Sequence, residues 1–157
     1  MSNVSENLFS VAFADNLNGT IVGWDGIILK TINGGESWSK VSSKYQTYFK
    51  DVIFVNEFLG FIVGGNGMIL RSENGGNSWK DININSSSGL YKIIFDNSDN
   101  GIIITNRGEV LHSSDAGKSW KMKSIGKPVA LNDIKQLNSG KYMIVGNNGS
   151  LFKSALQ

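Results

Sequence analysis

The chain has no cysteine, one histidine and one proline among its 157 residues. Without cysteine it forms neither disulfides nor thiolate metal sites, and it has no cysteine nucleophile. His112 alone cannot build a zinc site, so we expect no metal and no cofactor. The single proline, Pro128, and the 19 glycines suit an all-β protein with many tight turns and argue against disorder.

Charge is balanced. The sequence has 15 Lys and Arg against 13 Asp and Glu, a formal charge of +2. A dedicated nucleic-acid binder carries a concentrated basic surface, so we predict no nucleic-acid partner. Residues 1–7 contain neither a basic nor an apolar stretch, and no apolar run approaches the roughly 18 residues of a membrane span. We expect a soluble chain with no signal peptide and no membrane span, and the compartment stays unassigned.

What the sequence does contain is a repeat of 41 residues, without insertions. The tryptophans of three copies, Trp38, Trp79 and Trp120, are spaced by this period, and one glycine recurs in all four copies, at Gly26, Gly67, Gly108 and Gly149. A period of this length indicates a repeat architecture. The fourth copy stops before the position of its own tryptophan.

Each copy divides into four short strands separated by turn residues, which in the first copy are residues 8–14, 19–24, 27–31 and 37–41. Between the second and third strands, Asn/Asp-Gly pairs favour a tight turn with positive φ, and Arg107 is the exception. Four antiparallel strands per repeat predict a β-propeller in one domain, residues 1–157, with an all-β solenoid as the second choice. The expected blades are 8–41, 49–82, 90–123 and 131–157, the last one incomplete.

In the first three copies, the segment after the third strand has the form Ser/Thr-X-Asn/Asp-X-Gly-X-Ser-Trp. It resembles the Asp-box, or bacterial neuraminidase repeat, and the longer unit Gly60–Trp79 is most similar to the photosystem II stability and assembly factor family. That resemblance implies a seven-bladed propeller and a protein-interaction or assembly role. Asp-box propellers also include sialidases, glucanases and sorting receptors, so the fold alone does not decide the function.

We interpret the Asp-box as structure, because its Asn or Asp side chain accepts local backbone hydrogen bonds, its Gly takes a strained position and its Trp packs between blades. The residues assigned to this structural role are Asn33, Gly35, Trp38, Asn74, Gly76, Trp79, Asp115, Gly117 and Trp120.

Enzymatic alternatives lack residues. A sialidase needs an arginine triad, and the chain has only Arg71 and Arg107. Glycosidases need two facing carboxylates, and no pair stands out among the acids at strand ends and turns. We predict no catalytic residue. A lectin-like glycan-binding propeller or one related to glycoside hydrolases, as in a surface or viral adhesion apparatus, is the alternative.

Two sets of residues are candidates for binding. A basic residue recurs in the third strand, as a solvated or inter-blade charge or as an anion-facing patch, at Lys30, Arg71, His112 and Lys153. Trp24 stands where other copies have Gly or Asn, and turn chemistry does not explain it. Loops of one propeller face place it with aromatic and charged residues of the kind used in recognition, and this hypothetical site comprises Trp24, Asp25, Tyr45, Tyr48, Arg107 and Glu109.

The third strand of the fourth copy, near residues 150–154, lacks a neighbour, and a free strand edge invites pairing with another chain. Three arrangements follow: a closed four-bladed ring, two chains in an eight-bladed ring, or completion by a partner's strand. We favour a homo-oligomer. The predicted function is a non-catalytic interaction module that binds a protein partner or itself, with a glycan as the alternative ligand.

Overall fold

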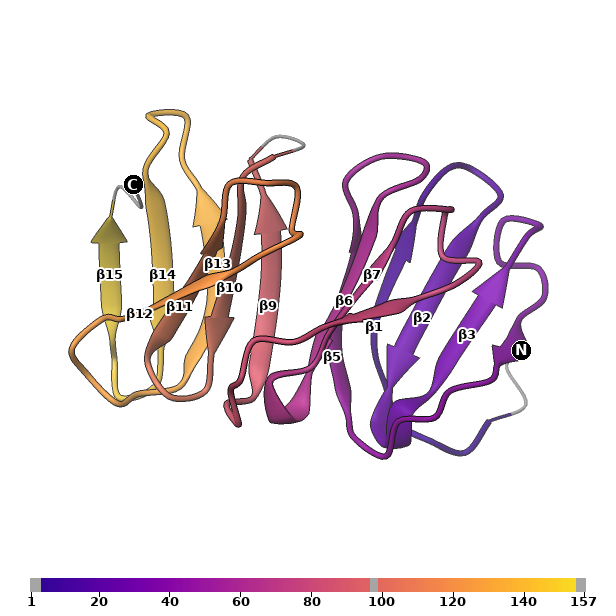
Figure 1. Ribbon diagram of the computed structural model, residues 1–157, viewed down its shortest axis with the longest axis horizontal. Helices are drawn as coiled ribbons and strands as arrows, with labels where there is room; N and C mark the ends of the chain where they lie inside the picture. Colours follow the sequence, from indigo (N-terminus) through magenta and orange to yellow (C-terminus); the bar gives the residue numbers. More distant parts are fainter. Residues whose placement is uncertain (1–3, 97–98, 155–157) are drawn as a thin grey trace.

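The computed structural model describes residues 4–96 and 99–154, and within them it contains four antiparallel sheets (Figure 1). The first sheet consists of β1 (Leu8–Phe13), β2 (Gly19–Gly23), β3 (Ile28–Thr31) and β4 (Ser39–Val41). The second consists of β5 (Phe49–Phe54), β6 (Gly60–Gly64), β7 (Ile69–Ser72) and β8 (Lys80–Ile82). In each sheet, consecutive strands pair in the order in which they follow along the chain.

The third sheet consists of β9 (Leu90–Phe95), β10 (Gly101–Thr105), β11 (Glu109–Ser113) and β12 (Lys121–Ser124). The fourth has three described strands, β13 (Leu131–Gln136), β14 (Tyr142–Gly146) and β15 (Leu151–Ser154). Residues 155–157 of the predicted fourth blade lie outside the described residues. We call the sheets blades 1 to 4. The prediction of an all-β propeller architecture with an incomplete last blade is confirmed.

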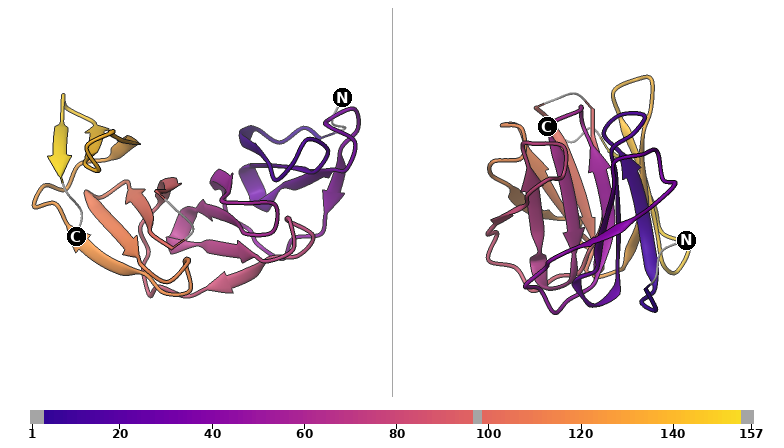
Figure 2. Two further views of the ribbon diagram at one scale, coloured as in Figure 1. Left: turned by 90° about the horizontal axis from the view of Figure 1, so that it is seen from above. Right: turned by 90° about the vertical axis from the view of Figure 1, so that its right-hand side faces the viewer.

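The blades stand side by side in an open arc (Figure 2). Contacts run between the first strands of consecutive blades, β1 with β5, β5 with β9 and β9 with β13. Figure 2 shows blade 1 and blade 4 at opposite ends of the arc, turned toward its open side. The alternative of a closed four-bladed ring is therefore wrong, because blade 4 does not return to blade 1.

Each blade has two apolar faces. The leading face packs on the preceding blade in blades 2 to 4, and the following face packs on the next blade in blades 1 to 3. Between blades 2 and 3, Ile93 and Leu111 of the leading face meet Val63 and Ile69 of the following face, and all four side chains are buried. Because the repeat has no insertion, the same positions form the clusters between blades 1 and 2 and between blades 3 and 4. The core therefore consists of three similar inter-blade layers.

A buried carboxylate joins the first three blades. Asp51 on β5 is 3% exposed and accepts hydrogen bonds from Ser10 Oγ (2.9 Å), from the Ile93 backbone N–H (3.1 Å) and from Lys92 Nζ (3.3 Å). A buried carboxylate is tolerated only when its oxygens are paired in this way. Asp51 thus fixes the register between β1, β5 and β9.

The Asp-box turns are built from local hydrogen bonds. Asn33 Oδ1 accepts the Ser37 N–H at 3.0 Å, and Asp115 Oδ1 accepts the Ser119 N–H at 3.0 Å. The indole N–H of Trp120 donates to Gly117 O at 3.2 Å, while its ring meets the edges of Phe61 and Phe95 between blades 2 and 3.

Asn and Asp are interchangeable in these turns because a serine hydroxyl adapts to either. Asn33 Nδ2 donates to Ser37 Oγ at 2.8 Å, whereas Asp115 Oδ2 accepts from Ser119 Oγ at 2.6 Å. A hydroxyl can act as donor or acceptor, so the turn keeps the same shape.

Helical structure is limited to two single 3-10 turns, η1 (Trp24–Gly26) and η2 (Gly65–Gly67), among the residues that the structure describes. In that part of the chain, no helix is long and apolar enough to cross a membrane.

Candidate functional site

The candidate site lies at the end of the blades where the first strand of each begins. Every first strand carries a β-bulge there, seen as a shift in its pairing with the second strand. The extra residue is Phe9 in blade 1, Lys50 in blade 2, Tyr91 in blade 3 and Asn132 in blade 4. A bulge leaves its residue outside the regular ladder and re-aims the side chain.

Trp24 is the first residue of η1, which connects β2 and β3. The turn is tight because Asp25 and Gly26 both have positive φ, 54° and 68°. It is anchored to the following loop by the hydrogen bond from Gly26 N–H to Thr47 O. The Trp24 side chain is 55% exposed, which is unusual for the largest apolar residue type.

Two aromatic rings hold the Trp24 indole in place. It stacks on Tyr48, with centroids 5.8 Å apart and planes 13° apart, and it meets Phe9 edge to face at 6.3 Å. The position of the Tyr48 ring requires a glycine at residue 89, because a Cβ on Gly89 would be 2.3 Å from the Tyr48 hydroxyl. Trp24 is therefore exposed but not free to move.

Lys50 completes the site from the bulge of blade 2. Its ammonium lies 4.6 Å from the Phe9 ring centre and 5.9 Å from that of Tyr91, within the range of cation–π attraction. Within residues 4–96 and 99–154, no carboxylate forms a salt bridge with Lys50. The hollow between these side chains has a volume of about 240 Å³, and we call it the rim pocket, lined by Phe9, Trp24, Tyr48, Lys50 and Tyr91.

The phenol of Tyr48 stays protonated. Burial raises the pKa of Tyr48, and the neighbouring Tyr91 raises it further. The pocket therefore combines aromatic surface, hydroxyl groups and one cation, which are groups suited to contact with apolar and anionic parts of a ligand.

The other predicted site residues lie outside the rim pocket. Tyr45 packs edge to face on Phe49 at 5.8 Å, and its hydroxyl donates to Asp81. Burial, followed by this hydrogen bond, raises the pKa of Tyr45. Asp25 is exposed next to Trp24.

On the corresponding turn of blade 3, Arg107 and Glu109 form local contacts. Arg107 Nη1 donates to Ser87 Oγ at 3.2 Å, and Glu109 Oε2 accepts from Ser88 Oγ at 2.5 Å. The structure therefore brings Trp24 together with Tyr48 but places Tyr45, Arg107 and Glu109 elsewhere.

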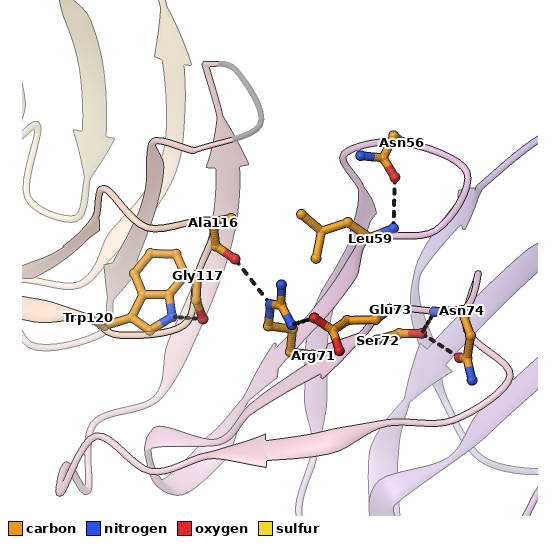
Figure 3. Close-up of polar contacts among 9 residues, drawn as sticks. All are labelled: Asn56, Leu59, Arg71, Ser72, Glu73, Asn74, Ala116, Gly117 and Trp120. Carbon is orange, nitrogen blue, oxygen red and sulfur yellow. Dashed lines mark hydrogen bonds and ion pairs between the residues drawn. The ribbon is translucent and has the colours of Figure 1, made fainter.

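Two of the four basic residues that recur in the third strands form hydrogen bonds between blades. Lys30 Nζ donates to Gly75 O at 3.2 Å, and Arg71 Nε donates to Ala116 O at 3.1 Å in the equivalent position of the next pair of blades (Figure 3). Arg71 also pairs with Glu73 at 2.6 Å. Burial lowers the pKa of Lys30, against the opposite influence of Asp15. His112 is half-buried and Lys153 is exposed.

Phe9, Lys50 and Tyr91 were not predicted as site residues. Their sequence signal is that one position holds Phe, Lys, Tyr and Asn in four copies that otherwise match closely. Strand alternation hides this signal, because a bulge changes the side on which a residue points.

A groove of about 670 Å³ lies along β5 and β9, and among the described residues that line it Asp96 is the only carboxylate. Hydrolysis of a glycosidic bond uses two facing carboxylates, and this groove does not provide them. In the described part of the chain, no cluster of three potential metal ligands occurs.

Residues 2–156 match the model of a protein family described as photosynthesis system II assembly factor YCF48. The chain belongs to this family. The structure titled YCF48 bound to D1 peptide superposes with a TM-score of 0.81 at 23% identity, over 97% of this chain and 51% of that one. YCF48 from Cyanidioschyzon merolae superposes with a TM-score of 0.79 at 18% identity, over 98% of this chain and 55% of that one. This chain thus spans about half the length of these YCF48 structures.

A GH74 xyloglucanase from Xanthomonas campestris has a TM-score of 0.70 at 12% identity, over 92% of this chain and 28% of that one. At such identity the likeness concerns the fold alone. A comparison with curated protein sequences finds no match.

Proposed function

We propose that this chain is a non-catalytic interaction module that binds an extended peptide segment of a partner protein at the rim pocket. The observation that carries the proposal is Trp24, which is 55% exposed yet fixed by stacking on Tyr48. A rigid, exposed aromatic residue loses little entropy on binding, and Trp and Tyr are enriched among the residues that dominate binding energy.

The chemistry of the pocket suggests what the peptide carries. The rings of Trp24 and Tyr48 offer a flat apolar surface, and Lys50 is a cation with no acidic partner in the described chain. We propose a segment in which an apolar side chain stands next to a carboxylate. Membership of the YCF48 family supports a peptide ligand, because one YCF48 structure is described as bound to a D1 peptide.

Glycan binding is the second candidate, because sugars also stack on exposed aromatic rings and the fold is similar to that of a xyloglucanase. Hydrolysis is disfavoured because the groove along β5 and β9 has a single carboxylate among its described lining residues. The glycan hypothesis therefore concerns recognition without catalysis.

Selection from a phage-displayed random peptide library tests the proposal. We expect enriched peptides that combine an acidic residue with an aliphatic or aromatic one. Fluorescence anisotropy with these peptides, and with a D1 peptide, would then show a loss of affinity of about tenfold or more for Trp24→Ala, as for a central interface residue.

Phe58→Ala is the matched control, because Phe58 is also a surface aromatic, 65% exposed, but lies in the turn between β5 and β6 at the opposite end of the blade. It should leave affinity unchanged. Equal losses for both variants, or no enrichment, would refute the peptide site. A glycan array that gives strong binding abolished by Trp24→Ala would favour the second candidate.

We also propose that the chain associates with itself. The exposed apolar faces at the two ends of the arc support this proposal.

A further inference from the structure

The leading face of blade 1 is apolar but uncovered. Leu8, Val11 and Phe13 are 39%, 56% and 43% exposed. The equivalents of Leu8 and Val11 in blade 2 are 0% and 2% exposed, and those in blade 3 are both fully buried, at Phe49, Val52, Leu90 and Ile93. The same positions are therefore the ones that bury a blade against its predecessor.

The following face of blade 4 shows the opposite half of this pattern. Val145 and Leu151 are 42% and 65% exposed. Their equivalents in the three other blades are at most 2% exposed, at Val22, Ile28, Val63, Ile69, Ile104 and Val110. The arc thus ends in two different apolar faces, each of which forms one side of an interface that already occurs three times within the chain.

We infer that two copies of the chain pack end to end, with blade 1 of each on blade 4 of the other, and close an eight-bladed ring with twofold symmetry. This inference specifies the proposed self-association and is independent of the rim pocket. Because the two terminal blades turn toward the same open side of the arc (Figure 2), a twofold rotation brings both pairs of faces together. A closed assembly leaves neither face exposed.

Polar contacts of the internal interfaces predict the register of the new one. Lys30 and Arg71 each donate to a carbonyl in the Asp-box of the next blade, at Gly75 and Ala116. By the same register, exposed Lys153 on β15 reaches the carbonyl of Gly34 of the second copy.

A second contact follows from Asp51, which accepts the backbone N–H of Ile93 on the next blade. The equivalent of Asp51 in blade 4 is Asp133, which is exposed in the single chain. In the ring, Asp133 accepts from the backbone N–H of Val11 of the second copy. Asp51 obtains this hydrogen bond from the blade that follows it. Asp133 therefore gains the same kind of partner when blade 1 of the second copy packs on blade 4.

Light scattering coupled to size exclusion at micromolar concentration tests the inference. We expect twice the monomer mass of 17.1 kDa for the unmodified chain. Val11→Asp and Leu151→Lys should each give the monomer mass, because each places a charge in an apolar layer. Leu17→Asp is the matched control, since Leu17 is 56% exposed in the turn after β1 and lies outside both faces. It should keep the dimer mass.

Mixing the two interface variants separates loss of folding from loss of contact. The internal equivalents of Val11 and Leu151 lie in one cluster, as Val52 and Ile28 do. An equimolar mixture of Val11→Asp and Leu151→Lys should therefore recover the dimer mass, through one native interface and one with an Asp–Lys pair. A monomeric unmodified chain, open-ended oligomers, or dimers that persist in both variants would overturn the inference. Peptide affinity of the Val11→Asp monomer reports on the rim pocket separately.

Discussion

Asp51 and Ser10 occupy the same position in consecutive repeats, and the hydroxyl of one donates to the carboxylate of the other at 2.9 Å. Asp51 also accepts the Ile93 N–H, so its removal leaves a buried donor unpaired. We expect Asp51→Ala to lower the free energy of unfolding by about 2–3 kcal/mol and Ser10→Ala by about 1 kcal/mol. Urea unfolding followed by circular dichroism measures both. Glu36→Ala, in an exposed turn, is the control and should change stability by less than about 0.5 kcal/mol.

Asp115→Asn should be nearly neutral at pH 7, because Asn33 and Asn74 already form the same turn in blades 1 and 2. Asp115→Ala should cost about 1 kcal/mol, since it removes the acceptor for the Ser119 N–H. Comparable unfolding midpoints for the Asn and Ala variants would contradict this assignment of the turn.

The same residue gives a pH dependence with a defined sign. Hydrogen bonds from the Ser119 side chain and backbone lower the pKa of Asp115 to about 2. A carboxyl whose folded pKa is below its ordinary value of 3.8 contributes stability above that value, and the contribution is lost as pH falls toward 2. The midpoint temperature of thermal unfolding should therefore fall more steeply between pH 5 and pH 2 for the unmodified chain than for Asp115→Asn. The difference is small because the carboxyl is exposed.

Arg71→Ala should destabilise the chain by about 1–2 kcal/mol, because it removes the hydrogen bond to Ala116 O across blades 2 and 3 and the packing over Phe61. Arg71→Lys should cost less than half of that, since Lys30 makes the equivalent contact between blades 1 and 2. Chemical denaturation compares the two variants, with exposed Lys118→Ala as the reference. Equal costs for Ala and Lys would show that the hydrogen bond contributes nothing.

Gly89→Ala is expected to disturb the rim pocket, although Gly89 is not one of its lining residues. A Cβ there would lie 2.3 Å from the Tyr48 hydroxyl, so the Tyr48 ring must shift away from Trp24. Near-ultraviolet circular dichroism should lose intensity from this ring pair, and affinity for the selected peptides should fall. Adding Tyr48→Phe removes the clash, and the double variant should recover both signals. Failure of that rescue would place the cause elsewhere in blade 3.

The repeat allowed the sheets to be predicted because its copies align without insertion. The first-copy strands expected at 8–14 and 19–24 are observed at Leu8–Phe13 and Gly19–Gly23. The open arc was not predictable, since it depends on the angle between blades, which no residue pattern encodes. The partners of Lys30 and Arg71 were equally hidden, because each lies 45 residues away on the next blade.

Trp24 was predicted as a site residue because it breaks the repeat, and Tyr48 was predicted because its loop was expected on the same propeller face. Trp24 replaces Gly or Asn at a turn, and it was noticed because a tight turn does not require a large aromatic side chain. Tyr45 was predicted for the same reason as Tyr48, as an aromatic residue of that loop. Its ring packs on Phe49 instead, because a loop sequence does not determine the direction of its side chains. Phe9 and Lys50 were not predicted, because the alternation of apolar and polar residues along a strand does not reveal a β-bulge.

The bulges also separate the residues that form the sheets and the inter-blade layers from residues that differ among the four copies of the repeat. In blade 1 the bulge residue meets the first turn residue as Phe9 and Trp24, and in blade 4 the same pair is Asn132 and Asn147, joined by an amide hydrogen bond at 2.9 Å. Neither residue of such a pair has to satisfy the strand ladder. Each copy of the repeat therefore has two positions, the bulge residue and the first turn residue, whose side chains can differ without altering the sheets. If the rim pocket binds as proposed, a change at these positions alters what is recognised and leaves the inter-blade layers intact.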